Sequence, residues 1–154
     1  MTTTRQPLPP QGRKRQGVAR ARGEKAGAGK AAQMELLAPR IKAGSSVGIT
    51  VGSRGIQNIC AMLEAAIDVV RRCGATPVLL SAMGSHGGGT PEGQKEVLDS
   101  LNITEERLGA KVVTCATCRS IGQTPDGLTA HMLDSAFSVD AIIPINRVKT
   151  HTSF

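Results

Sequence analysis

Apolar residues along the chain form short continuous runs that alternate with segments of helical periodicity. Runs at residues 46–51, 76–81, 111–114 and 140–145 are typical of strands buried on both faces of a parallel sheet. Between the first two runs, apolar residues recur at helical spacing, at Ile56, Ile59, Cys60, Leu63, Ile67 and Val70. This strand–helix–strand pattern predicts a parallel pair joined by a crossover helix, and hence an α/β, Rossmann-like sheet.

The ends of the predicted helices carry recognisable capping residues. The first crossover helix is expected to end at Cys73, with Gly74 just beyond it. Thr90 and Pro91 are typical of an N-cap and a first helical position, so a second helix is predicted over residues 91–101. Its apolar residues are expected to be buried: Val97, Leu98 and Leu101. A further helical turn is predicted from Thr104 to Gly109.

The remaining elements are short. The Thr-Pro-Asp-Gly segment at 124–127 is a turn signal, which predicts a hairpin of residues 119–123 and 128–131 at the edge of the sheet. A short helix is predicted over residues 133–137. Another is predicted over residues 34–41 and is expected to stop near Pro39.

Charge divides the 154-residue chain into two parts. Residues 1–33 hold eight Lys or Arg and one acid, whereas residues 34–154 hold eleven of each sign. The first part is predicted to be a disordered basic tail, and the second a neutral α/β domain. The tail could be a nucleic-acid or localisation arm, or a solvated extension. We favour the extension, because the tail has no aromatic residue for stacking on nucleic acid.

Several classes of protein are disfavoured by composition. No run of eighteen apolar residues exists, so no membrane-spanning helix is predicted, and the N-terminus lacks the apolar core of a secretory signal. A cytoplasmic location follows as the expectation. The CxxC of Cys115 and Cys118 has no second pair at zinc-binding spacing and does not open a helix, so we interpret it as small residues at a strand end.

A glycine-rich segment after the second predicted strand is the strongest candidate for a ligand-binding loop. Residues 82–94 contain five glycines, which allow positive φ and close approach of the backbone to a ligand. His86 stands in the middle of this segment without a bulky neighbour. A loop between a strand end and a helix start is where open α/β sheets bind ligands, and the helix N-terminus favours an anion.

Two further strand ends carry polar residues of the same kind. Arg54 follows the first strand, and His151 lies in the segment after the last strand. Because parallel strands end at one edge of the sheet, Arg54, His86 and His151 are expected to converge there. An arginine can hold a carboxylate through two hydrogen bonds, and two histidines can act as base and acid. His131, in the predicted hairpin, is assigned no role.

The segments 51–56, 82–94 and 146–152 resemble, in order and spacing, the N-terminal domain of the nickel-dependent lactate racemase family. The resemblance spans residues 41–154 and implies an isomerase, a racemase or epimerase of small 2-hydroxyacids. It implies a nickel-pincer nucleotide as cofactor, His86 and His151 as the acid/base pair on the substrate hydroxyl, and Arg54 in substrate binding. Further residues are assigned to the cofactor on the same basis: Ser85, Gly87, Thr90 and Lys149.

The chain also departs from that family. Lactate racemases proper have aspartate where this chain has Val51 and arginine where it has Gly87, so a substrate other than lactate is expected. In the family, the lysine that tethers the cofactor and the metal-binding histidine lie beyond the position of His151, as does a second domain. We therefore expect no metal ligand here and an inactive, truncated chain. A non-catalytic module that binds small anions or nucleotides through the glycine segment is the alternative.

Overall fold

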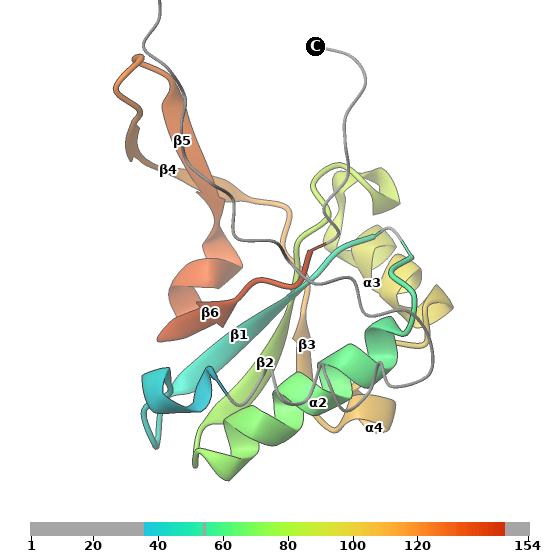
Figure 1. Cartoon of the computed structure of the whole chain (residues 1–154). Helices are drawn as coiled ribbons and strands as arrows, with labels where there is room; N and C mark the ends of the chain where they lie inside the picture. The colour runs from blue at the N-terminus through green and yellow to red at the C-terminus, as the bar shows by residue number, and fades with distance from the viewer. Residues whose placement is uncertain (1–35, 54, 147–154) are drawn as a thin grey trace, which may run out of the picture.

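A four-stranded parallel sheet flanked by helices forms the centre of the molecule (Figure 1). The computed structural model describes residues 36–53 and 55–146, so the basic tail, Arg54, Lys149 and His151 lie outside the described residues. The strand order is β3-β2-β1-β6, and the α/β, Rossmann-like fold class is confirmed. The strands are β1 (Ser46–Val51), β2 (Thr76–Ser81), β3 (Lys111–Val113) and β6 (Ala141–Ile143).

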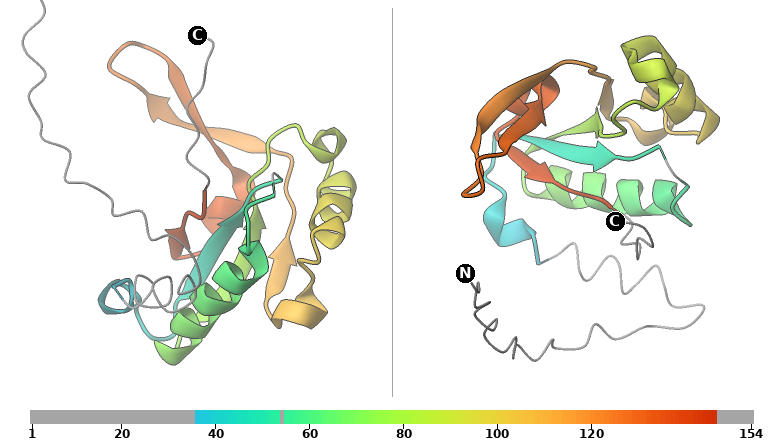
Figure 2. Two further views of the ribbon diagram at one scale, coloured as in Figure 1. Left: turned by 45° about the vertical axis from the view of Figure 1, so that its right-hand side comes forward. Right: turned by 90° about the horizontal axis from the view of Figure 1, so that it is seen from above.

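The core lies between the sheet and α2 (Ile59–Arg72). Ile49 of β1 pairs with Leu79 of β2 and Ile143 of β6, and Ile49 and Leu79 are fully buried. Leu63 and Val70 of α2 pack in the same apolar cluster. Because side chains alternate along a strand, the residues next to these in sequence belong to the opposite face of the sheet. Figure 2 shows α2 covering only one of the two faces.

Most helix ends lie where the capping residues predicted them. Gly74 and Gly109 have positive φ just beyond α2 and α4 (Glu105–Leu108), as glycine at these positions allows. Thr90 and Thr104 accept hydrogen bonds from the first turns of α3 (Pro91–Ser100) and α4. Two details differ from the prediction. Helix α2 begins at Ile59, three residues after Ile56, the first apolar residue of the predicted helical pattern. Of the three apolar residues that were predicted to be buried in the second helix, Leu98 is fully buried, whereas Val97 and Leu101 are half-buried.

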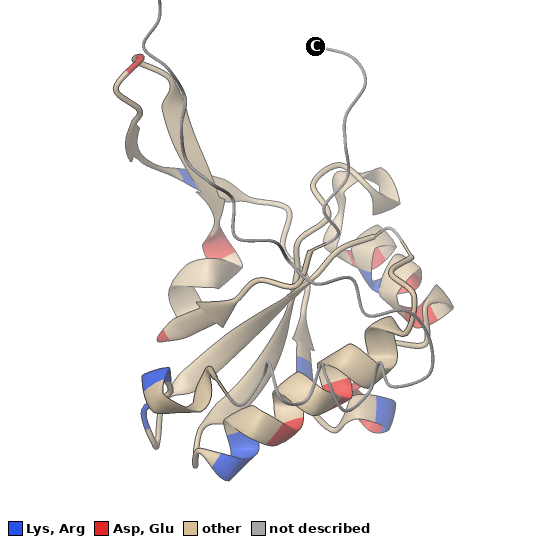
Figure 3. Cartoon of the chain, viewed as in Figure 1, with Lys and Arg blue, Asp and Glu red and all other residues tan. Residues whose placement is uncertain are grey.

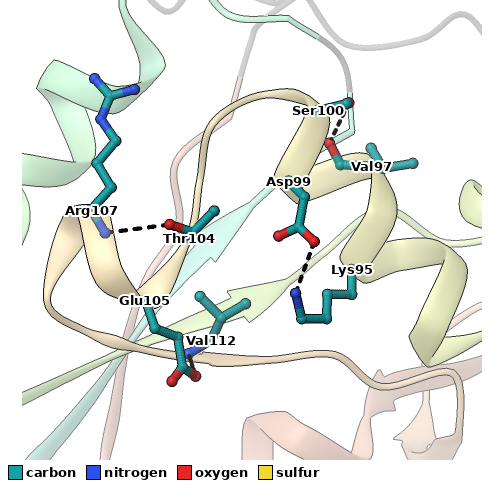
Figure 4. A network of polar contacts seen from close by, with 8 residues as sticks. All are labelled: Lys95, Val97, Asp99, Ser100, Thr104, Glu105, Arg107 and Val112. Carbon is teal, nitrogen blue, oxygen red and sulfur yellow. Dashed lines mark hydrogen bonds and ion pairs between the residues drawn. The ribbon is translucent and has the colours of Figure 1, made fainter.

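The connection from α3 through α4 to β3 is held by polar contacts at the surface (Figure 4). Lys95 pairs with Asp99 one turn along α3, at 2.8 Å between Nζ and Oδ2. The Glu105 carboxylate accepts a 2.7 Å hydrogen bond from the Val112 backbone N–H on the edge strand β3. This bond satisfies a donor that no neighbouring strand can pair, because β3 is the last strand of the sheet on that side.

The hairpin prediction is correct for its strands and wrong for its location. β4 (Cys118–Gln123) and β5 (Thr129–Leu133) pair with each other in a separate two-stranded sheet rather than at the edge of the main sheet. Figures 1 and 2 show this hairpin projecting from the body of the molecule. It carries few charged residues compared with the helices (Figure 3).

The two predicted short helices are 3-10 helices. The segment after β5 forms η3 (Asp134–Ser138), close to the predicted range of 133–137. Near the start of the described chain, η1 (Ala38–Arg40) contains Pro39 in its first turn, so the proline begins this helix and does not stop it. The first turn tolerates proline because its N–H groups have no partner within the helix. No helix in the described part of the chain is both long enough and apolar enough to cross a membrane.

Candidate functional site

Three neighbouring strands bring their carboxyl ends to one edge of the sheet. β2, β1 and β6 are adjacent and parallel, so Ser53 after β1, the loop after β2 and Asn146 after β6 all leave the same edge. The chain passes from β1 to β2 to β3 in one direction and then returns to β6 on the other side of β1. Such a reversal of strand order marks the place where open α/β sheets bind ligands. The three strand ends therefore lie at one edge, as expected for parallel strands. The convergence of Arg54, His86 and His151 stays a prediction, because Arg54 and His151 lie outside the described residues.

The glycine segment after β2 is folded tightly against the helix that follows it. Gly87, Gly88 and Gly89 form the short helix η2 (Gly87–Gly89) with φ of 65°, 67° and 68°, a region that glycine occupies without strain. A Cβ at Gly93 would lie 1.9 Å from the carbonyl oxygen of Gly87. A Cβ at Gly87 would lie 2.4 Å from the carbonyl of Gly93. The loop and the first turn of α3 therefore touch backbone to backbone, and neither glycine has room for a side chain.

Thr90 joins the loop to α3. Its Oγ1 accepts a 3.1 Å hydrogen bond from the Gly93 N–H, as predicted for an N-cap, and donates to the Gly87 carbonyl at 3.3 Å. At Gly87 and Gly93, the lack of a side chain lets two segments of the chain approach each other closely, rather than letting a ligand approach the backbone. Ser85 is exposed in the same loop. The assignment of Ser85, Gly87, Thr90 and Lys149 to cofactor binding stays a prediction.

A buried polar network lies beneath the loop and was not predicted. Gln94 of α3 is only 1 % exposed, and its Oε1 accepts hydrogen bonds from the Ser81 hydroxyl at 2.7 Å and the Cys115 backbone N–H at 3.2 Å. Its Nε2 donates to the Gly84 carbonyl at 3.5 Å. One side chain thus ties together the ends of β2 and β3 and the glycine loop. The signal available in the sequence was a glutamine on the helical face that carries Leu98.

His86 presents one ring nitrogen to its surroundings. The residue is exposed, and its Nδ1 lies 2.8 Å from the carbonyl oxygen of Met83. A carbonyl can only accept, so Nδ1 carries the hydrogen, and the neutral ring has its lone pair on Nε2. The loop therefore fixes the tautomer that would accept a proton at Nε2. His131, on β5, is also exposed, on the projecting hairpin.

The cysteines are free thiols, as the sequence indicated. The Thr117 hydroxyl is the main group that lowers the pKa of the Cys115 thiol, and the backbone N–H of Ser135 adds to the effect. Cys115 lies just after β3 and Cys118 begins β4, in agreement with the predicted place of the CxxC at a strand end. Within residues 36–53 and 55–146, no group of three or more His, Cys, Asp or Glu side chains is arranged to hold a metal ion.

The fold and this site define the class of protein: an α/β protein with a parallel sheet and a candidate site at the carboxyl edge of the sheet. Comparison with known proteins adds no relative, since no family model, curated protein or solved structure matches the chain. The resemblance to the racemase family therefore depends on the three sequence segments alone.

Proposed function

We propose that this chain is the N-terminal domain of a 2-hydroxyacid racemase or epimerase, in which His86 moves the proton of the substrate hydroxyl. The observation that carries the proposal is the hydrogen bond between His86 Nδ1 and the Met83 carbonyl, because it leaves Nε2 as the nitrogen that can take and return a proton. The position of the loop beside β1, next to the reversal of strand order, supports a ligand at this edge.

The roles of the other residues follow from the resemblance. Arg54 would hold the substrate carboxylate, and His151 would exchange the hydroxyl proton from the side opposite His86. The nickel-pincer nucleotide that the resemblance implies would supply the acceptor for the hydride of the substrate α-carbon. Ser85, Gly87, Thr90 and Lys149 would contact that cofactor, and the two histidines would move the proton of the hydroxyl. We also propose the cytoplasm as the compartment, because all four cysteines of the chain are free thiols, as a reducing environment keeps them.

Titration of the whole chain with small 2-hydroxyacids tests this proposal. The ring nitrogens of ¹⁵N-labelled histidine would be followed by NMR while D- or L-lactate, 2-hydroxybutyrate or malate is added, with inorganic phosphate as the reference anion. We expect a saturable change at His86 Nε2 with at least one 2-hydroxyacid and no change at His131, which serves as the internal control. His86→Gln should weaken the binding of that hydroxyacid, measured by calorimetry, by about 3- to 10-fold, because the hydrogen bond between Nε2 and the substrate hydroxyl is lost.

Two results would overturn the proposal. The first is the absence of any saturable change at His86 with all of the 2-hydroxyacids. The second is equal binding of phosphate and hydroxyacid that His86→Gln leaves unchanged, which would indicate a general anion-binding module that uses the backbone of the glycine loop.

A further inference from the structure

His86 lies between two points at which the glycine loop is attached to α3. Two residues before His86, the Gly84 carbonyl accepts a hydrogen bond from Gln94 Nε2 at 3.5 Å. One residue after it, Gly87 contacts the backbone of Gly93 so closely that neither glycine has room for a side chain. Because the His86 side chain is exposed, the loop rather than surrounding side chains sets where its ring lies.

The ring of His86 is oriented by one carbonyl group. The Met83 carbonyl lies 2.8 Å from His86 Nδ1 and also accepts a 3.2 Å hydrogen bond from the His86 backbone N–H. Its direction is fixed by the peptide plane that joins Met83 to Gly84. The Met83 side chain is buried, which anchors one end of this plane. Gly84, at the other end, has no side chain and a φ of 58°, so its hydrogen bond to Gln94 is the anchor there.

The side-chain amide of Gln94 is itself held in one orientation. Gln94 is 1 % exposed, and its Oε1 accepts hydrogen bonds from Ser81 Oγ at 2.7 Å and from the Cys115 N–H at 3.2 Å. The Cys115 N–H can only donate and the Gly84 carbonyl can only accept, so the oxygen of the amide faces Cys115 and its nitrogen faces the loop. Gln94 therefore connects the loop beside His86 to the buried ends of β2 and β3.

We propose that Gln94 is the positioning residue for His86. By holding the Gly84 carbonyl, its amide keeps the Met83 carbonyl directed at His86 Nδ1, so that the neutral ring carries its hydrogen on Nδ1 and leaves Nε2 open for the substrate proton. An exposed imidazole without such an acceptor exchanges between its two tautomers. The inference rests on the proposed function for the role of Nε2, but its test needs no substrate, so either proposal can fail without the other.

The tautomer of His86 is the quantity to measure. The whole chain, ¹⁵N-labelled at histidine, would be followed by long-range ¹H–¹⁵N NMR at about pH 8.5, where an imidazole of ordinary pKa is neutral. We expect the Nδ1–H form to predominate in the unmodified chain. Gln94→Met keeps the length of the side chain and removes its amide, and should lower the ratio of Nδ1–H to Nε2–H by about 3- to 10-fold, as for one neutral hydrogen bond. His131, exposed on the hairpin, should not change.

Two control variants separate positioning from a general loss of stability. Leu98→Val removes buried volume one turn further along α3, outside the loop. Ser81→Ala removes one donor to Gln94 Oε1 and leaves the bonds of Gln94 to the Cys115 N–H and the Gly84 carbonyl in place. Both variants should be less stable than the unmodified chain and should keep its His86 tautomer ratio.

The unmodified chain provides a second test that does not depend on the folding of Gln94→Met. The Nε2 protons of the buried Gln94 should exchange with solvent about 10-fold or more slowly than those of Gln123, which is exposed on β4. Equal exchange at the two glutamines would overturn the proposal, as would a mixture of tautomers in the unmodified chain. A tautomer ratio that is unchanged in Gln94→Met, or that falls equally in Leu98→Val, would overturn it too. Binding of hydroxyacids at His86 bears only on the proposed function.

Discussion

The glycine loop of residues 82–94 and the β4–β5 hairpin are held in place by different means. The loop has little regular structure of its own before α3, yet it is fixed by backbone contact between Gly87 and Gly93 and by the buried side chain of Gln94. The hairpin is paired along its length apart from a bulge between Ser120 and Gly122, but every residue of β4 is exposed. Two of the apolar side chains of the hairpin, Ile121 and Leu128, are 50 % and 69 % exposed.

The difference shows that strand pairing within a segment does not by itself fix that segment to the rest of the domain. The hairpin contacts the body mainly at its base, where Arg119 pairs with Asp134 at 2.7 Å and its guanidinium lies 4.4 Å from the centre of the Phe137 ring. A two-stranded hairpin is marginally stable without a packed face. The loop, in contrast, is joined to buried groups, so a substitution in the loop should lower the free energy of unfolding of the whole domain.

The largest effect is expected from Gly93→Ala. Its new methyl group would lie 1.9 Å from the Gly87 carbonyl oxygen, and backbone cannot turn aside as a flexible side chain can. We expect a loss of about 3 kcal/mol or more in the free energy of unfolding. Urea unfolding followed by circular dichroism measures it.

Gly55→Ala is the matched control for that substitution. No atom lies within 4 Å of a Cβ built at Gly55, which does not have the positive φ of the loop glycines. This variant should be neutral, or more stable by up to about 1 kcal/mol, because alanine reduces the freedom of the unfolded chain. Similar losses in the two variants would contradict the backbone contact described for the loop.

Gln94→Leu should have an intermediate effect. Leucine removes the acceptor shared by Ser81 Oγ and the Cys115 N–H, and leaves buried polar groups without their partner. We expect a loss of about 1–3 kcal/mol in the free energy of unfolding, with faster hydrogen exchange in residues 84–94. The same change in the hairpin, Gln123→Leu, should stay within about 0.5 kcal/mol because Gln123 is exposed. Equal losses at the two positions would count against the network.

The smallest effect is expected on the reactivity of the Cys115 thiol, which lies between the glycine loop and the β4–β5 hairpin. Because the pKa of Cys115 is lowered, mainly by the Thr117 hydroxyl, its thiolate should form at a lower pH than in an ordinary cysteine. The rate of alkylation by iodoacetamide, measured against pH by mass spectrometry, should therefore rise at a lower pH in the unmodified chain than in Thr117→Val. Cys73, at the end of α2, is the control and should behave alike in both. An unchanged profile at Cys115 would show that Thr117 does not stabilise the thiolate.

The amino-acid sequence by itself determined the elements whose signals are local. The bounds of β1 and β2 agree with the predicted runs at 46–51 and 76–81. A strand that is apolar on both faces is stable only where both faces of the sheet are covered, so such a run predicts a central strand. Thr90, Thr104 and Gly109 cap their helices as predicted, because a cap depends only on residues within one turn of it. The carboxyl-edge position of the loop with His86 followed from the same local reasoning.

The tertiary structure alone decided the features that join residues distant along the chain. Whether the hairpin pairs with the main sheet depends on which strand edges are already occupied, and the turn at 124–127 carries no information about that. The burial of Gln94 depends on the ends of β2 and β3 meeting beneath the loop. An apolar pocket lined by Thr50, Leu80, Ala136 and Ile142 exists only because η3 lies over β1, β2 and β6. These contacts are set by packing between elements, and packing is a property of the assembled fold rather than of any one segment.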